Sequence, residues 1–189
     1  MSRIDKIGAL RVEPALDHPE LLAPPVLRAL REWPVSQVDV RDVGVAEIDP
    51  SLADTAAFCQ AYDIPLEISA NCVIIAGRRG GETKYAAAMV LATTRADVNG
   101  VIRRRLDARK ASFAPMEDAV NATEMEYGGI TPFGLPDRWP VLVDARVAAT
   151  EVAVVGSGVR RSKLFVPGAA LAGLPMAEVI DNLSLPQQA

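Results

Sequence analysis

The stretch EYGGITPFGLP, residues 126–136, decides the fold of this chain. It combines three glycines and two prolines with Tyr127, Ile130, Phe133 and Leu135. Glycine permits positive φ and close approach to the backbone, whereas proline stiffens the chain, so these residues favour a rigid, packed loop. Such a loop suits the wall of a small-molecule pocket. A tight, buried connection between two strands has the same composition, and both interpretations stay open here.

The composition indicates one compact domain, alone or with an added segment, because half of the 189 residues are apolar. Arg, Asp or Glu interrupts every apolar run before it reaches the length of a membrane span. The N-terminus lacks the basic, apolar and small-residue pattern of a signal peptide. We therefore expect a cytoplasmic protein that does not bind membranes.

Cysteine and histidine are too scarce for several kinds of chemistry. Cys59 and Cys72 form no CxxC pair, and we expect them to be buried, reduced thiols. His18 is the one histidine, so a zinc site or a Ser-His or Cys-His nucleophile is not expected, and no cofactor is implied. The net charge of −4 excludes a general DNA or RNA binder held by a basic surface, and any nucleic-acid contact should be local.

Two parts of the chain differ in character. Residues 1–35 carry repeated prolines, and Val26, Leu30 and Trp33 share one face of a short helix that we expect to pack on the outside of the main domain. Residues 36–189 form that domain. Its predicted elements are an edge strand (37–43), a helix (51–62), a hairpin of two strands (71–76 and 85–92), a helix capped by Asp97 (97–106), a strand (111–114), a helix (115–123), strands at 141–144, 152–155 and 163–166, a helix (167–174) and a final strand (178–180). Strands and helices without strict alternation predict a mixed α+β fold.

Arg103, Arg104 and Arg105 form a run of positive charge at the end of the helix that Asp97 begins. A charge run on a helix is usually a solvated face. The functional alternative is a local patch that contacts phosphates.

The segment YGGITPFG, residues 127–134, resembles the GGxSPFG segment of the YbaK/ProX aminoacyl-tRNA editing domains. The strand at 141–144 resembles that family's next strand, and the turn Gly156-Ser157-Gly158 ahead of 163–167 resembles its late glycine turn. The helix and strand within 97–114 resemble the elements before the loop. The resemblance covers about residues 36–182 and leaves residues 1–35 outside it.

The resemblance implies a mixed, strongly curved, barrel-like sheet core flanked by helices. It also implies a trans-editing enzyme that hydrolyses the ester of a mischarged tRNA, most often tRNA for proline, and that can dock on an aminoacyl-tRNA synthetase. Members use no metal and no nucleophilic triad. Backbone groups of their GxxxP loop hold the aminoacyl ester, and the tRNA ribose assists the attacking water.

Carried over residue by residue, the resemblance assigns a site to this chain. Backbone N–H groups of Gly128 and Gly129 would stabilise the oxyanion. The other implied contacts are Thr131 and Pro132 in the pocket wall and Gly156 and Gly158 where the backbone approaches closely. Asp144 either orients a neighbour or binds the substrate amine, or it makes hydrogen bonds at a strand end.

The sequence departs from the family at the entry to its first buried strand, where the family has a lysine. Asn71 stands there and would orient the ester or the ribose without a fixed positive charge. Lys84 either reaches the same cavity or is a solvated lysine at the end of a hairpin. The missing lysine leaves two further alternatives: a catalytically silent module that binds an aminoacyl end or a protein, and a hydrolase of another small ester or amide.

Overall fold

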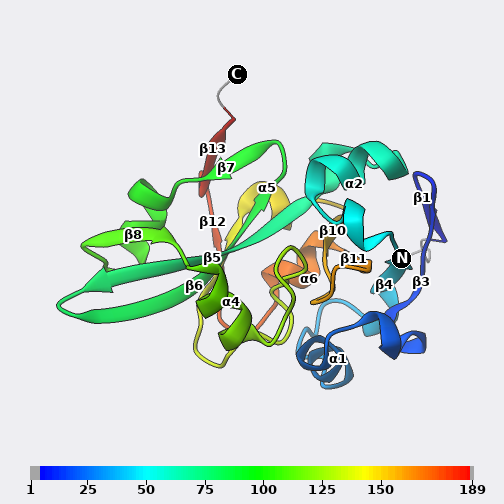
Figure 1. Ribbon diagram of the computed structural model, residues 1–189, viewed down its shortest axis with the longest axis horizontal. Coiled ribbons are helices and arrows are strands. Elements are labelled where there is room, and N and C mark those ends of the chain that lie inside the picture. The colour runs from blue at the N-terminus through cyan, green and yellow to red at the C-terminus, as the bar shows by residue number, and fades with distance from the viewer. Residues whose placement is uncertain (1–4, 188–189) are drawn as a thin grey trace.

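The structure is a computed structural model that describes residues 5–187, and two sheets form its framework (Figure 1). The five-stranded sheet has the order β12 (Ala177–Ile180), β9 (Val141–Asp144), β6 (Glu82–Leu91), β5 (Ala70–Arg79) and β8 (Lys110–Phe113). The four-stranded sheet has the order β10 (Ala153–Gly156), β11 (Ser162–Val166), β4 (Gly44–Glu47) and β3 (Glu13–Pro14). Two small antiparallel pairs join β1 (Lys6–Ile7) to β2 (Leu10–Arg11) and β7 (Thr94–Ala96) to β13 (Ser184–Pro186).

Short helices surround these sheets. The α-helices are α1 (Pro24–Arg31), α2 (Thr55–Tyr62), α3 (Arg103–Arg105), α4 (Met116–Thr123), α5 (Ala145–Ala148) and α6 (Gly168–Ala172). Short 3-10 helices lie at η1 (Ala15–Asp17), η2 (Pro19–Leu21), η3 (Val40–Asp42), η4 (Pro50–Leu52) and η5 (Leu66–Ile68). A short π-helix lies at η6 (Val98–Ile102). The predicted mixed α+β class is confirmed, but the sheets of residues 5–187 do not close into a barrel. None of the helices in this part of the chain is long and apolar enough to cross a membrane.

The β5–β6 hairpin is the longest pairing in the molecule and separates two layers. Its strands are apolar and joined at Gly80 and Gly81, whose positive φ values suit a tight turn. Because neighbouring residues of a strand point to opposite faces, Ile74 packs with Ala119 of α4, whereas Ile75 packs with Ile102 of η6. The cavity described below lies on the Ile74 side.

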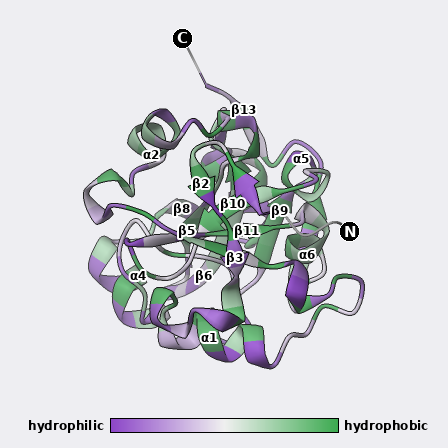
Figure 2. Cartoon of the chain, turned by 90° about the vertical axis from the view of Figure 1, so that its right-hand side faces the viewer, coloured by the Kyte–Doolittle hydropathy of each residue, from purple (hydrophilic) through white to green (hydrophobic). Residues whose placement is uncertain are grey.

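The N-terminal segment belongs to the main core, so the prediction that it packs on the outside is wrong. Pro25 begins α1 and its apolar face is buried, with Val26 and Leu30 fully inaccessible among residues of both sheets. Strand β3 also extends the four-stranded sheet through β4. Figure 2 shows this arrangement: hydrophobic residues gather in the central strands, and α1 carries both hydrophobic and hydrophilic residues.

The strand predicted at residues 37–43 is also wrong in position. The side chain of Asp39 accepts a hydrogen bond from the backbone N–H of Arg41 and begins the η3 turn instead. The strand β4 starts at Gly44, where pairing with β11 and β3 becomes available. The local side-chain bond therefore prevails over the apolar alternation of this short stretch.

Candidate active site

A cavity of about 290 Å³ lies where the two sheets meet, between α2, α4 and the glycine-proline loop. Strand β5 and the glycine-proline loop supply eight of its nineteen lining residues, and the others come from the start of α2, β8, α4, β10, β11 and the residues beside them. It is lined by Ala53, Asp54, Thr55, Ser69, Ala70, Asn71, Cys72, Val73, Ile74, Phe113, Ala114, Ala119, Tyr127, Gly128, Ile130, Val154, Val155, Gly156 and Lys163.

The sheets are joined beside this cavity by an isolated parallel bridge between Ser69 and Val154. Asn71 lies two residues after Ser69 on β5, and Gly156 lies two residues after Val154 on β10. Gly156 is paired across the next ladder with Lys163. Since directly paired residues present their side chains to the same face of a sheet, Lys163 lies on the same face as Gly156, and both residues line the cavity.

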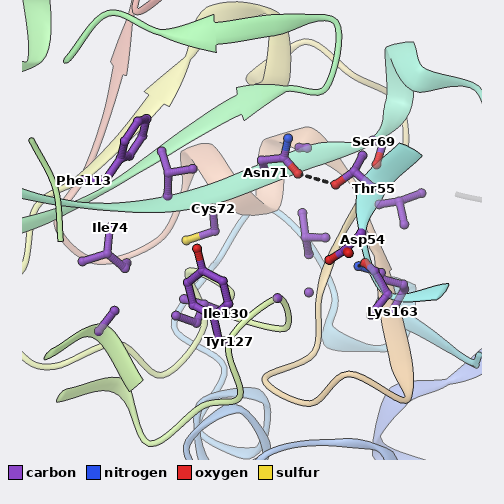
Figure 3. Close-up of a pocket in the computed structure, with 18 of the residues that line it drawn as sticks. Asp54, Thr55, Ser69, Asn71, Cys72, Ile74, Phe113, Tyr127, Ile130 and Lys163 are labelled. Carbon is purple, nitrogen blue, oxygen red and sulfur yellow. Dashed lines mark hydrogen bonds between the residues drawn. The ribbon is translucent and has the colours of Figure 1, made fainter. Parts of the chain in front are cut away.

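Asn71 lines the cavity and is held by α2. Its Oδ1 accepts a hydrogen bond of 2.7 Å from Oγ1 of Thr55, the first residue of α2, as the dashed line in Figure 3 marks. This bond leaves the Nδ2 donors of the amide for another partner. Asn71 is therefore oriented before any ligand arrives.

Lys163 is the most unusual side chain of the cavity, because it is only 8% exposed. Its Nζ donates a hydrogen bond of 2.9 Å to the carbonyl oxygen of Ala53 and lies 5.2 Å from the centre of the Phe58 ring. Burial lowers its pKa to about 8; Arg160 acts in the same direction, and Cys59 and Asp54 oppose the shift. At neutral pH the cavity thus holds a largely desolvated ammonium group.

The glycine-proline loop is fastened to the turn that follows β10. The backbone N–H of Gly158 donates to the carbonyl of Gly129 at 2.7 Å, and the N–H of Glu126 donates to the carbonyl of Gly158 at 2.9 Å. A Cβ at Gly156 would lie 2.3 Å from the carbonyl oxygen of Gly129, so only glycine fits there. Two glycine-rich segments far apart in the sequence therefore form one rigid wall.

Gly128 stands at the mouth of the cavity in a left-handed conformation, with φ of +86°. Arg160 clamps the loop there: its guanidinium donates to the carbonyls of Tyr127 and Pro50, and its backbone N–H donates to the carboxylate of Glu126. In residues 5–187 the N–H of Gly128 has no hydrogen-bond acceptor. Of the two N–H groups predicted to contact the oxyanion, those of Gly128 and Gly129, only the one of Gly128 is free at the cavity, because that of Gly129 donates to the carbonyl of Glu126.

The two ends of the cavity differ in polarity, as Figure 3 shows. Asn71, Thr55, Asp54 and Lys163 lie at one end, and Cys72, Ile74 and Ile130 line the other with Ala114 and Ala119. Cys72 is half-buried, unlike the buried Cys59, so the prediction that both thiols are buried holds only for Cys59. Desolvation raises the pKa of Cys72 to about 12, so its thiol is protonated at neutral pH. The cavity can hold a ligand with a small apolar group at one end and polar oxygens at the other.

Of the residues predicted for the site, the structure brings Asn71, Gly128 and Gly156 to the cavity wall. Gly129 and Gly158 shape the wall from behind, and the N–H of Gly129 is already bonded to the carbonyl of Glu126. The predicted oxyanion contact from Gly129 is therefore not available.

Thr131 and Pro132 also lie outside the cavity wall. Thr131 is fully buried, and its Oγ1 has no hydrogen-bond partner among the described residues. Pro132 lines a separate groove beside α1. The loop turns away from the cavity after Ile130, so its second half packs against the N-terminal segment instead.

Asp144 makes hydrogen bonds at the end of β9 and does not reach the cavity. It is 1% exposed and accepts from the guanidinium and N–H of Arg146 and from the hydroxyl and N–H of Ser184. Burial alone would raise its pKa, but these hydrogen bonds outweigh burial and the pKa is lowered. Of its two predicted roles, the structure supports the one at the strand end.

The basic residues predicted for the site lie elsewhere. Lys84 is exposed at the far end of the β5–β6 hairpin, where it pairs with Gly77. Arg103 to Arg105 follow η6 on the opposite face of the five-stranded sheet, and Arg105 forms an ion pair with Glu178. None of these four side chains lines the cavity.

Seven polar or aromatic residues of the cavity were not predicted for the site: Asp54, Thr55, Ser69, Cys72, Phe113, Tyr127 and Lys163. Asp54 and Thr55 were read only as part of a helix, and Tyr127 only as part of the loop. One signal for Lys163 was present, since it is a lone charge in an otherwise apolar strand.

A glycine-walled cavity between two sheets defines the class of small-ligand sites. The profile of the aminoacyl-tRNA editing domain matches residues 49–174, and this chain belongs to that family. A search of curated proteins finds no match.

Two solved structures share the fold. One is described as a candidate trans-editing enzyme for prolyl tRNA synthetase; it has a TM-score of 0.67 and 19% identity, over 85% of this chain and 97% of that one. The other comes from work on epitope backbone grafting onto scaffold proteins, with a TM-score of 0.69 and 19% identity, over 84% of this chain and 95% of that one. At this level of identity the likeness concerns the fold.

Proposed function

We propose that this protein hydrolyses the ester between an amino acid and the 3′ end of a tRNA, and that this tRNA is tRNA for proline. The observation that carries the proposal is the cavity with its apolar end, its polar end and the unbonded N–H of Gly128 in its wall. Membership of the editing-domain family and the fold shared with a candidate prolyl trans-editing enzyme support it.

In the proposed reaction the amino-acid side chain enters the apolar end, beside Cys72 and Ile74, and the ribose lies at the polar end. The Nδ2 donors of Asn71 hold a ribose oxygen. Water adds to the acyl carbon, the N–H of Gly128 stabilises the oxyanion, and the bond from carbon to the ribose oxygen breaks. The proton from water goes to that ribose oxygen, which yields the free amino acid and a tRNA with its hydroxyl restored.

The need for such an activity follows from the limits of recognition. A synthetase pocket distinguishes side chains that differ by one methylene by only about 1–3 kcal/mol, so errors with small amino acids occur. A second, differently shaped cavity removes them. A synthetase is therefore the protein partner that we expect.

A deacylation assay tests the proposal. The purified protein is incubated with tRNA for proline charged with alanine, cysteine, serine or proline, and with other mischarged tRNAs. We expect release of a small, wrong amino acid from tRNA for proline at least tenfold above buffer. Release no faster than in buffer for every pair would reject the proposal.

A second candidate function is a silent module that binds an aminoacyl end or a protein, and the asparagine at position 71 favours it. Two variants decide between the candidates. Deacylation that appears in Asn71→Lys from an inactive parent supports the module. An active parent that loses activity in Asn71→Ala, with its melting temperature retained, rejects it.

The remaining candidate function is hydrolysis of another small ester or amide that is not attached to a tRNA. Competition separates them: an excess of uncharged tRNA should inhibit deacylation if the cavity is built for a tRNA end. Hydrolysis of a simple amino-acid ester that tRNA does not inhibit would favour a small-molecule substrate.

A further inference from the structure

The cavity contains a lysine, but on a different strand from the one that the family resemblance leads one to expect. Position 71 on β5 is asparagine, and Lys163 on β11 enters the same cavity. The row Asn71, Gly156 and Lys163 explains how this is possible. Lys163 is the cross-strand partner of Gly156 on the edge strand β10, and both residues line the cavity, so a lysine on β11 reaches the same space as Asn71.

The ammonium group of Lys163 is only partly satisfied by the protein. It carries three N–H donors, and the carbonyl of Ala53 is the one hydrogen-bond acceptor it has within residues 5–187. In that part of the chain the ammonium of Lys163 forms no ion pair. The nearby carboxylate of Asp54 is largely exposed, and its Oδ1 lies 3.7 Å from Nη1 of Arg160 instead. Donors are therefore left for an oxygen of a ligand in the cavity.

Stability of the fold does not account for this lysine. A buried ammonium without a carboxylate partner loses its hydration, which opposes folding at neutral pH. A methionine of similar length would fill the same space beside Phe58 without that cost. Lys163 is costly to bury, lies in a cavity and has free N–H donors. These properties together are typical of a cation with a functional role.

We propose that Lys163 supplies, from β11, the cation that related domains supply from the position of Asn71, and that its ammonium holds the carbonyl oxygen of the aminoacyl ester as that oxygen becomes an oxyanion. This inference rests on the proposed function. Lys163 and the N–H of Gly128 then act as two donors to one oxygen. A charge held in a dry cavity stabilises an oxyanion far more than the same charge in water.

Steady-state deacylation kinetics test the inference with Lys163→Met, Lys163→Gln and the control Lys110→Met, an exposed lysine of β8. We expect kcat to fall by about 10²–10³ in both Lys163 variants, with KM changed less than threefold, and no change in the control. The melting temperature of Lys163→Met at pH 7 should equal or exceed that of the parent. An unchanged kcat, or a loss confined to KM, overturns the inference.

The exchange of the two positions is a sharper test. In Lys163→Met, the second substitution Asn71→Lys returns an ammonium to the cavity from β5. We expect it to recover at least a tenth of the parental kcat. No recovery in a folded double variant would contradict the equivalence of the two positions.

A binding measurement separates this inference from the proposed function. The probe is an aminoalkylphosphonate ester of adenosine, whose anionic tetrahedral phosphorus imitates the intermediate. We expect calorimetry to show at least tenfold weaker binding to Lys163→Met than to the parent. If the parent hydrolyses no charged tRNA but binds the probe in this lysine-dependent way, the hydrolytic function fails, and Lys163 keeps only the role of binding an anionic oxygen in the cavity. Equal affinities of parent and variant would overturn that role whether or not the parent is active.

Discussion

Lys163 determines the electrostatics of the cavity, because it is the one buried cation among the described residues. Its neighbours with charge or titratable groups are Asp54 and Cys59 on the α2 side and Arg160 before β11. The carbonyl of Ala53 and the Phe58 ring hold its position, yet they do not replace the hydration that the ammonium loses. Its effect on stability should therefore depend on pH.

The free energy of unfolding should rise between pH 8 and pH 10.5 because of Lys163. Its pKa is about 8 in the folded protein and 10.5 ordinarily, so within this range the unfolded chain binds the proton and the folded protein releases it. The rise should total about 3 kcal/mol. Urea unfolding of the parent and of Lys163→Met, both in a Cys59→Ala background so that this thiol does not titrate, measures it. Parallel pH dependences for the two proteins would contradict the expectation.

Asp144 provides the opposite case, a buried charge with a structural role. Asp144→Asn should lower the free energy of unfolding by about 1–3 kcal/mol, because it weakens the bonds to Arg146 and Ser184. KM for charged tRNA should not change, since the residue is outside the cavity wall. Chemical denaturation measures the free energy of unfolding, and steady-state kinetics measure KM. A changed KM with unchanged stability would assign Asp144 to the substrate instead.

At the scale of elements, the loop of residues 126–136 and the turn after β10 behave as one unit. Their carbonyls and N–H groups bond to one another, and Arg160 ties the loop to the start of α2. The position of Gly128 at the cavity thus depends on a contact between segments that are about thirty residues apart, from Gly128 to Gly158. Disturbing the contact should move the N–H of Gly128, the proposed donor to the oxyanion.

Gly156→Ala should disturb it, because its Cβ would lie 2.3 Å from the carbonyl oxygen of Gly129 and 2.7 Å from that of Ile130. We expect a loss of about 1–3 kcal/mol in stability from overpacking and at least a tenfold loss in kcat. Gly80→Ala is the control: open space surrounds it, and its positive φ costs about 1–2 kcal/mol far from the cavity. Denaturation and deacylation are measured for both. Equal kcat values in the two variants would show that the loop position does not matter.

The elements that the sequence predicted well are those with a strong local signal. The apolar runs on both sides of Gly80 predict the hairpin, and Asp97 predicts the helix whose Gly100 and Val101 N–H groups it caps. The strand expected at 37–43 failed because a single side-chain bond from Asp39 redirects the chain. Short bonds of this kind leave little trace in hydrophobic periodicity.

The candidate site was harder to predict for a different reason. The glycine-proline loop is one continuous segment, so its part of the cavity could be recognised. The polar end combines Thr55, Asn71 and Lys163, which come together only through the bridge between the sheets and the pairing of Gly156. Pairings between distant strands, such as the one that brings Lys163 into the cavity, are set by the packing of the whole domain and not by local pattern.

At the scale of the whole molecule, residues 5–35 complete the core of the editing domain. Ala15, Leu22 and Val26 pack in the largest apolar cluster together with residues of both sheets. The carbonyl of Pro25 also lies directly against Gly134 of the glycine-proline loop. The N-terminal segment therefore supports the wall of the cavity from the outside.

Leu30→Ala tests this support. Leu30 is fully buried in α1, so its truncation should lower the free energy of unfolding by about 2–5 kcal/mol. The neighbouring Arg31→Ala, on the exposed face of the same helix, should change it by less than about 0.5 kcal/mol. Urea denaturation gives both values. A similar small effect of the two substitutions would mean that α1 only rests on the surface.

The junction of the two sheets at Ser69 and Val154 has a mechanical consequence. Each sheet keeps its own ladder of hydrogen bonds, and they meet beside the cavity at an isolated bridge and not along a shared strand. A small change in the angle between the sheets would widen or narrow the space between Asn71 and Lys163 without breaking either ladder. If the proposed function holds, we expect acyl groups of different size to be accommodated by a change in the angle between the two sheets, while the peptide groups proposed to contact the ester keep their local geometry.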